Sequence, residues 1–113
     1  MSFRPTLCLG RIIYTPAKPH LNLDELMYVV ALPPEDTLPE KGKIVLCRIY
    51  WGLKSNDWEI SYGEYVINCA VRLRITKDQF ERCRADDDCL PQEKIDELYE
   101  AYAAADLKNA LGY

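Results

Sequence analysis

The sequence predicts a single α+β domain over residues 1–113, with a mainly antiparallel sheet of about five strands followed by two helices packed on one face. Three observations support this: strand-type alternation dominates residues 6–76, helical spacing begins only after Thr76, and no strand–helix–strand alternation occurs. Strands that precede helices in this way are typical of an antiparallel sheet covered by helices. The length and the 49% hydrophobic content suit one such domain.

Three strands are predicted in the first half of the chain, separated by proline-bearing loops. Residues 6–14 form the first, with Gly10 as a bulge. Residues 26–32 fit either a short helix or a strand, and their β-branched and aromatic residues favour the strand. Residues 43–51 are apolar on both alternating sets and interrupted only by Arg48, which indicates a central strand covered on both faces.

A hairpin follows, with a short strand at residues 58–61, a turn at Tyr62-Gly63 and a long strand at residues 64–76. The long strand alternates over about a dozen residues, which is typical of a half-buried strand. Its predicted inward set is Tyr65, Ile67, Cys69, Val71, Leu73 and Ile75. A Val71→Asp substitution is therefore expected to place an unpaired charge in the core and to unfold the domain.

Two helices are predicted after this strand. Thr76 and Gln79 fit a capping box for a short helix over residues 77–84. Pro91 suits the first turn of a longer helix that Gly112 ends. The predicted apolar stripe of the longer helix is Ile95, Leu98, Tyr99, Tyr102, Ala103, Leu107 and Leu111. The acidic run between the helices, Asp86, Asp87 and Asp88, is expected to be a solvated turn.

Charge is unevenly distributed along the chain. Residues 1–84 carry twelve basic and ten acidic side chains, whereas residues 85–113 carry two and eight. A near-neutral body with an acidic tail argues against direct nucleic-acid binding, which needs cationic surface. No apolar run is long enough to span a membrane or to serve as a signal peptide. Five cysteines, an odd number, suit reduced thiols and a cytoplasmic location.

Known catalytic and cofactor motifs are absent from the sequence, so no catalytic residue, cofactor or metal site is predicted. His20 is the only histidine and lies in a proline-rich loop, and no glycine-rich phosphate loop occurs. The acidic run at residues 86–88 lacks the alternating ligands and glycine of a calcium loop. Cys83 and Cys89 lack the spacing and the second ligand pair of a zinc site.

Two surface features stand out as candidates for partner binding. The first is an acidic surface on the helical tail, made of Asp86, Asp87, Asp88, Glu93, Asp96, Glu97 and Glu100. It would dock on a basic protein surface. The second is a smaller candidate, Arg72 and Arg74, predicted to point away from the face of Tyr65, together with Tyr62. Tyr and Arg are enriched at binding hot spots, and aromatic side chains beside cations also suit a single-stranded nucleic-acid platform.

The leading functional hypothesis is a non-enzymatic protein-binding module. It would act as a small inhibitor or accessory factor of a nucleic-acid-handling complex, such as the anti-defence proteins that phages encode. One alternative is a structural or assembly subunit, viral or homo-oligomeric, which leaves a homo-oligomer open. The other is an enzyme that works without a recognisable motif, because fold class alone never excludes chemistry.

Overall fold

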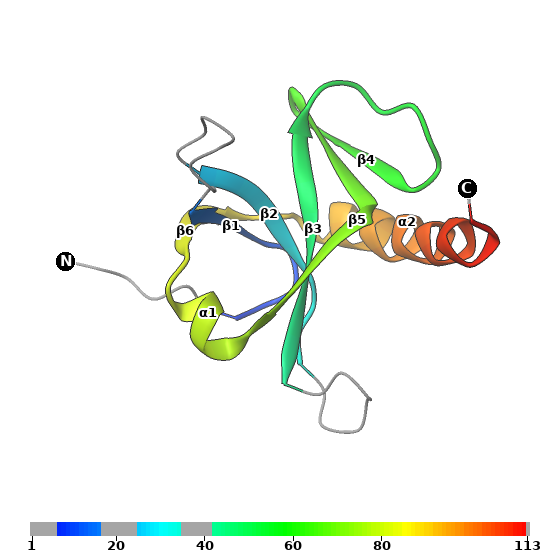
Figure 1. Ribbon diagram of the computed structural model, residues 1–113. Helices are drawn as coiled ribbons and strands as arrows, with labels where there is room; N and C mark the ends of the chain where they lie inside the picture. Colours follow the sequence, from blue (N-terminus) through cyan, green and yellow to red (C-terminus); the bar gives the residue numbers. More distant parts are fainter. Residues whose placement is uncertain (1–6, 17–24, 35–41, 113) are drawn as a thin grey trace.

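The computed structural model describes residues 7–16, 25–34 and 42–112 as six strands and two helices (Figure 1). In chain order these are β1 Arg11–Pro16, β2 Glu25–Leu32, β3 Lys43–Trp51, β4 Glu59–Tyr62, β5 Tyr65–Thr76, α1 Lys77–Glu81, β6 Arg84–Cys89 and α2 Gln92–Leu111. The strands form one sheet in the order β4-β5-β3-β2-β1-β6, and all neighbours are antiparallel. The predicted α+β class is confirmed, with six strands in place of about five.

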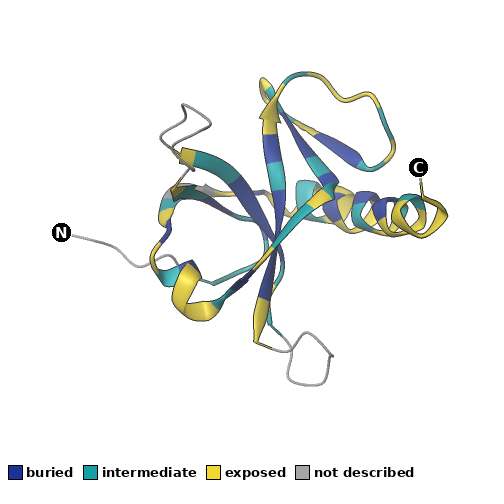
Figure 2. Cartoon of the chain, viewed as in Figure 1, coloured by how far each residue is buried: buried dark blue, intermediate teal, exposed yellow. Residues whose placement is uncertain are grey.

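The helices lie on opposite sides of the sheet, not on one face as predicted (Figure 1). α2 packs on a core that includes Ile12, Cys47, Ile49, Ile67 and Leu98. α1 packs through Phe80 and neighbouring Cys83 on a second core that includes Ile13, Val30, Ile44 and Leu46. Figure 2 shows buried positions along the central strands, and consecutive buried residues such as Leu46 and Cys47 belong to the two different cores. This confirms that β3, which is apolar on both alternating sets, is a central strand.

A bulge in β5 changes the inward set that alternation predicted. Arg48 of β3 pairs with Asn68 and Cys47 pairs with Arg72, so residues 69–71 of β5 have no opposite partner on β3. An insertion of an odd number of residues moves the following side chains to the other face of the sheet. Val71 lies in this bulge with a relative exposure of 40%, so its predicted place in the core is wrong.

The same bulge divides the predicted inward set between the two cores. Ile67 and Cys69, before or at the bulge, lie in the core beneath α2. Ile75, after it, lies in the core beneath α1, although all three share one alternating set in the sequence. Arg72 comes to the α2 side for the same reason, which corrects the prediction that it points away from the face of Tyr65.

Residues 84–89, predicted as a helix end and a solvated turn, form the edge strand β6. α1 ends at Glu81, three residues earlier than predicted. β6 pairs with β1 through Ala85 opposite Ile13 and Arg84 opposite Tyr14. Pairing with the open edge of β1 outweighs the weak strand propensity of three consecutive aspartates. The prediction of a turn here is therefore wrong.

Several local predictions are confirmed. Thr76 and Gln79 form both hydrogen bonds of a capping box at the start of α1. Gly112 ends α2 in the left-handed conformation with φ of 75°. The buried stripe of α2 differs from the predicted one, because Leu98, Ala101 and Ala105 are buried whereas Tyr99, Leu107 and Leu111 are more than half exposed. Small alanines let the helix backbone approach the sheet closely.

Candidate nucleic-acid interface

The acidic residues of α2 lie on its exposed side. Glu93, Asp96, Glu97 and Glu100 are all exposed, and two of them have local partners. The Lys94 ammonium contacts the Glu97 carboxylate at 3.1 Å, and the Gln92 amide donates to Asp96 at 3.1 Å. The side chains of residues 86–88 lie outside the described part of the structure. Nothing tests the predicted contact of this acidic surface with a partner, which stays a prediction.

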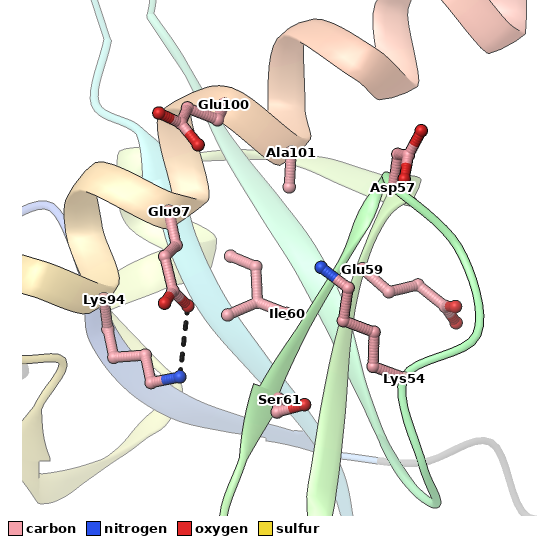
Figure 3. Close-up of a pocket in the computed structure, with 9 residues that line it drawn as sticks. All are labelled: Lys54, Asp57, Glu59, Ile60, Ser61, Lys94, Glu97, Glu100 and Ala101. Atoms are coloured by element: carbon pink, nitrogen blue, oxygen red, sulfur yellow. Dashed lines mark hydrogen bonds and ion pairs between the residues drawn. The ribbon is translucent and has the colours of Figure 1, made fainter.

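A pocket of about 320 Å³ lies between α2 and the segment that contains β4 (Figure 3). Two lysines and four carboxylates line it, together with Ile60, Ser61 and Ala101; the charged residues are Lys54, Lys94, Asp57, Glu59, Glu97 and Glu100. The Lys94–Glu97 ion pair crosses part of it (Figure 3). Because acids outnumber bases, this pocket is a poor site for a phosphate.

Glu59 is 7% exposed and has a structural role in this region. Its carboxylate accepts hydrogen bonds from the Ser55 backbone N–H and hydroxyl at 3.0 Å and from the Asn56 amide at 3.1 Å. Burial opposes ionisation of Glu59, but these hydrogen bonds outweigh it and lower the pKa of the carboxyl. The ionised carboxylate of Glu59 therefore holds the β3–β4 loop in place.

The secondary candidates, Arg72, Arg74 and Tyr62, do not form one site. Arg72 is 9% exposed and anchors α2: its guanidinium contacts Asp106 at 2.6 Å and donates to the carbonyl oxygens of Cys69 and Tyr102. Arg74 is exposed on the same strand, and Tyr62 packs partly buried at the β4–β5 hairpin. His20 lies outside the described residues.

A different cluster, Tyr28, Arg48 and Tyr50, lies on the sheet face opposite to α2. Arg48 and Tyr50 alternate along β3 with Cys47 and Ile49, which belong to the core beneath α2. Tyr28 of β2 pairs directly with Arg48 and belongs to the core on the α1 side. We call these three residues the Arg48 cluster.

The Arg48 guanidinium is held in place by both rings and by the backbone. Its central carbon lies 5.5 Å from the centroid of the Tyr28 ring and 4.9 Å from that of Tyr50, within the range of cation–π attraction. Its Nη1 donates to the carbonyl oxygens of Met27, at 3.0 Å, and Ile49. Among the described residues, Nε and Nη2 have no acceptor, and neither atom is buried. A fixed guanidinium with donors left over is suited to bind a phosphate.

The two tyrosines differ in exposure. Tyr28 is buried, and burial raises the pKa of its hydroxyl although the nearby Arg48 cation acts in the opposite direction. Tyr50 is 38% exposed, so its ring is available for stacking. Beyond it, at the end of β3, Trp51 is 71% exposed and meets Tyr65 edge-on with ring centroids 5.5 Å apart. The end of β3 thus carries one fixed cation and exposed aromatic rings.

In the sequence, Arg48 is the one polar interruption of an apolar strand, and no role was predicted for it. Its partner Tyr28 could not be found, because only the β2–β3 register places it opposite Arg48. In the described part of the chain, no group of three or more His, Cys, Asp or Glu side chains is placed to hold a metal ion. No described helix is long and apolar enough to cross a membrane.

No protein-family model matches this chain, and no curated protein matches it in sequence. A solved structure does match in fold. It is described as an endoribonuclease in complex with its cognate antitoxin, from a mycobacterial species, and aligns with a TM-score of 0.64 at 11% identity. The alignment covers 88% of this chain and 94% of the matched one. At this identity the similarity shows a shared fold.

This similarity contradicts two predictions from the sequence, that the chain is not an enzyme and that it is a phage-type inhibitor. Both depended on the absence of a recognisable catalytic motif. The matched fold occurs in a complex that contains an endoribonuclease, so the absence of a recognisable motif does not exclude an enzyme. The matched structure contains a protein partner, which agrees with the general prediction of protein binding.

Proposed function

We propose that this protein is an endoribonuclease that binds single-stranded RNA at the Arg48 cluster and is controlled by a protein partner. The observation that carries the proposal is the fold similarity, which extends over nearly the whole length of both chains. The Arg48 cluster supplies the chemistry that such a function needs on the surface, a phosphate-binding cation beside a ring that can stack on a base.

In this proposal Arg48 binds the scissile phosphate through Nε and Nη2. Attack of the 2′-hydroxyl oxygen on phosphorus forms a 2′,3′-cyclic phosphate and breaks the bond to the 5′-oxygen; the 2′-hydroxyl loses a proton and the departing 5′-oxygen takes one up. The transition state carries added negative charge on the phosphate oxygens. The guanidinium stabilises that charge, and the Met27 and Ile49 carbonyls keep it from reorienting. Tyr50 stacks on a neighbouring base, which favours single strands because their bases are accessible. No residue is assigned as general acid or base.

The position of the acidic helix supports RNA binding at this face. α2 packs on the opposite side of the sheet from the Arg48 cluster. Repulsion between its carboxylates and a phosphate is screened over about 8 Å at physiological ionic strength. The acidic tail, which argued against nucleic-acid binding when only total charge was considered, is thus separated from the proposed site.

The test is cleavage of an end-labelled, mixed-sequence single-stranded RNA by the purified chain, with Mg²⁺ and with EDTA. We expect cleavage by the parent protein and a loss of rate of about 100-fold in Arg48→Ala, the effect of removing one charge-stabilising donor. Arg82→Ala is the matched control, since Arg82 is exposed at the end of α1 and belongs to no part of the cluster. Thermal melts of both variants establish that they are folded.

The outcomes separate the function from the site. If the parent cleaves no RNA under either condition, the endoribonuclease proposal is wrong. If the parent cleaves RNA and Arg48→Ala cleaves it equally well, the function stands and the Arg48 cluster is not the site. Product ends that carry a 2′,3′-cyclic phosphate would identify the 2′-hydroxyl as the nucleophile.

A further inference from the structure

Cys8 and Cys89 face each other at the surface, although 81 residues separate them in the chain. Their Sγ atoms are 3.5 Å apart, Cys89 is exposed and Cys8 is partly exposed. A disulfide has an S–S distance of about 2.05 Å. Shortening the Sγ–Sγ distance to this value requires only small side-chain rotations where the backbones of the two residues lie close together.

The backbone around both residues is held by one hydrogen-bonded turn. The Arg11 N–H donates to the Cys8 carbonyl at 3.2 Å, and Arg11 is the β-bridge partner of Cys89. The carbonyl oxygen of Gly10, which lies between Cys8 and Arg11 in the chain, accepts a hydrogen bond from the Leu90 N–H at 3.0 Å. These bonds place the segment before β1 directly beside the end of β6.

Gly10 is required for this arrangement. Its φ of +84° is a conformation that favours glycine, and a β-carbon there would lie 3.2 Å from the Ile95 side chain and 3.3 Å from that of Leu90. The turn therefore also contacts the first turns of α2. Residues 8 and 89 are held next to each other by packing that does not depend on the thiols.

The other three cysteines are in a different chemical situation. Cys47, Cys69 and Cys83 are buried. A hydrogen bond with Cys69, together with burial, raises the pKa of the Cys47 thiol, and burial raises that of Cys83. Thiols of this kind react slowly with oxidants, because the thiolate is the reactive form and the oxidant needs access.

We infer that Cys8 and Cys89 are an oxidation site that a two-electron oxidant of the hydroperoxide class converts into an intrachain disulfide. This inference goes beyond the proposed function and does not depend on RNA cleavage. One thiolate attacks a peroxide oxygen, the O–O bond breaks, and a sulfenic acid and water are formed. The second thiol attacks that sulfur and releases a second water. In total, two thiols and one hydrogen peroxide give one disulfide and two waters.

The disulfide would connect the segment before β1 with the end of β6, and the loop that it closes would include nearly the whole sheet. Closing so long a loop restricts the unfolded chain strongly, while the folded state already holds the two residues together. We expect the melting temperature to rise by at least about 10 °C on oxidation and to return on reduction with a dithiol.

The experiment treats the reduced full chain with one equivalent of hydrogen peroxide. We expect a mass loss of 2 Da, the loss of two titratable thiols, and one linked peptide pair that contains Cys8 and Cys89. The variants Cys8→Ser and Cys89→Ser alter surface positions and should stay folded, lose no mass, and show no increase in melting temperature. Retention of five free thiols in the parent, or a linked peptide with another pair of cysteines, would overturn the inference. An equal 2 Da loss in either serine variant would do the same.

Discussion

Arg72 is expected to be the main polar anchor of α2, and replacing it tests how the helix is attached to the sheet. Its guanidinium stacks on the Tyr102 ring at 3.6 Å, donates to the carbonyl oxygens of Cys69 at 2.8 Å and Tyr102 at 3.1 Å, and contacts Asp106 at 2.6 Å. The side chain of Arg72 is 9% exposed, whereas that of Asp106 is 58% exposed. The contacts therefore contribute unequally to the free energy of unfolding, and the exposed ion pair with Asp106 contributes least.

The expected cost of Arg72→Ala follows from these contacts. Hydrogen bonds from a charged donor contribute about 1.5–3 kcal/mol each, but the helix carbonyl of Tyr102 keeps other partners. Stacking on the ring adds about 1 kcal/mol. The exposed ion pair adds less than about 1 kcal/mol. Because such contributions do not add fully, we expect a loss of about 3 kcal/mol in the free energy of unfolding, a large part of the total for a small domain.

Urea unfolding followed by circular dichroism measures this loss, with Asp106→Asn and the double variant completing a cycle. We expect Asp106→Asn to cost less than about 1 kcal/mol. A change of less than about 0.5 kcal/mol in Arg72→Ala would refute the anchoring role. If Asp106→Asn cost as much as Arg72→Ala, the ion pair would be the source of the energy, and our ranking of the contacts would be wrong.

Two further predictions concern β5 and the β3–β4 loop. Val71→Asp should change the free energy of unfolding, measured in urea, by less than about 1 kcal/mol, because Val71 is 40% exposed. Ile67→Asp, at a fully buried position, should prevent folding. Equal effects of the two substitutions would contradict the observed bulge. Because the folded-state pKa of Glu59 is lowered, its hydrogen bonds to Ser55 and Asn56 stabilise the fold above the unfolded-state pKa and are lost as pH falls through the lower, folded-state value. Glu59→Gln should therefore make thermal stability less dependent on pH in the acid range, and an unchanged pH profile would contradict this role.

Local patterns in the sequence predicted the elements that local interactions decide. Lys43–Trp51 is the strand that its apolar residues predicted, and the Thr76–Gln79 capping box starts α1 where expected. Residues 26–32, which fitted a strand or a helix, lie in the strand β2, Glu25–Leu32. In each case the deciding contacts lie within a few residues along the chain or in the periodicity of one segment.

The candidate site depends on contacts between segments that lie far apart in the sequence. A lone Arg48 in an apolar strand was visible in the sequence, but its proposed role depends on Tyr28, twenty residues away, and on which face α2 leaves open. The thiol pair of Cys8 and Cys89 was invisible for the same reason, because β1–β6 pairing creates it. Neither juxtaposition has a signature within any single segment.

The sequence by itself determined the α+β class, the central strand, the start of α1 and the end of α2. Tertiary structure decided that residues 84–89 are a strand, that residues 69–71 bulge out of register, and that the helices cover opposite faces. The physical reason is that hydrogen bonding and side-chain spacing within a segment select its type. Strand register and packing between distant segments select which face of the sheet each side chain occupies. An insertion of an odd number of residues in β5 was enough to move the following side chains to the other face.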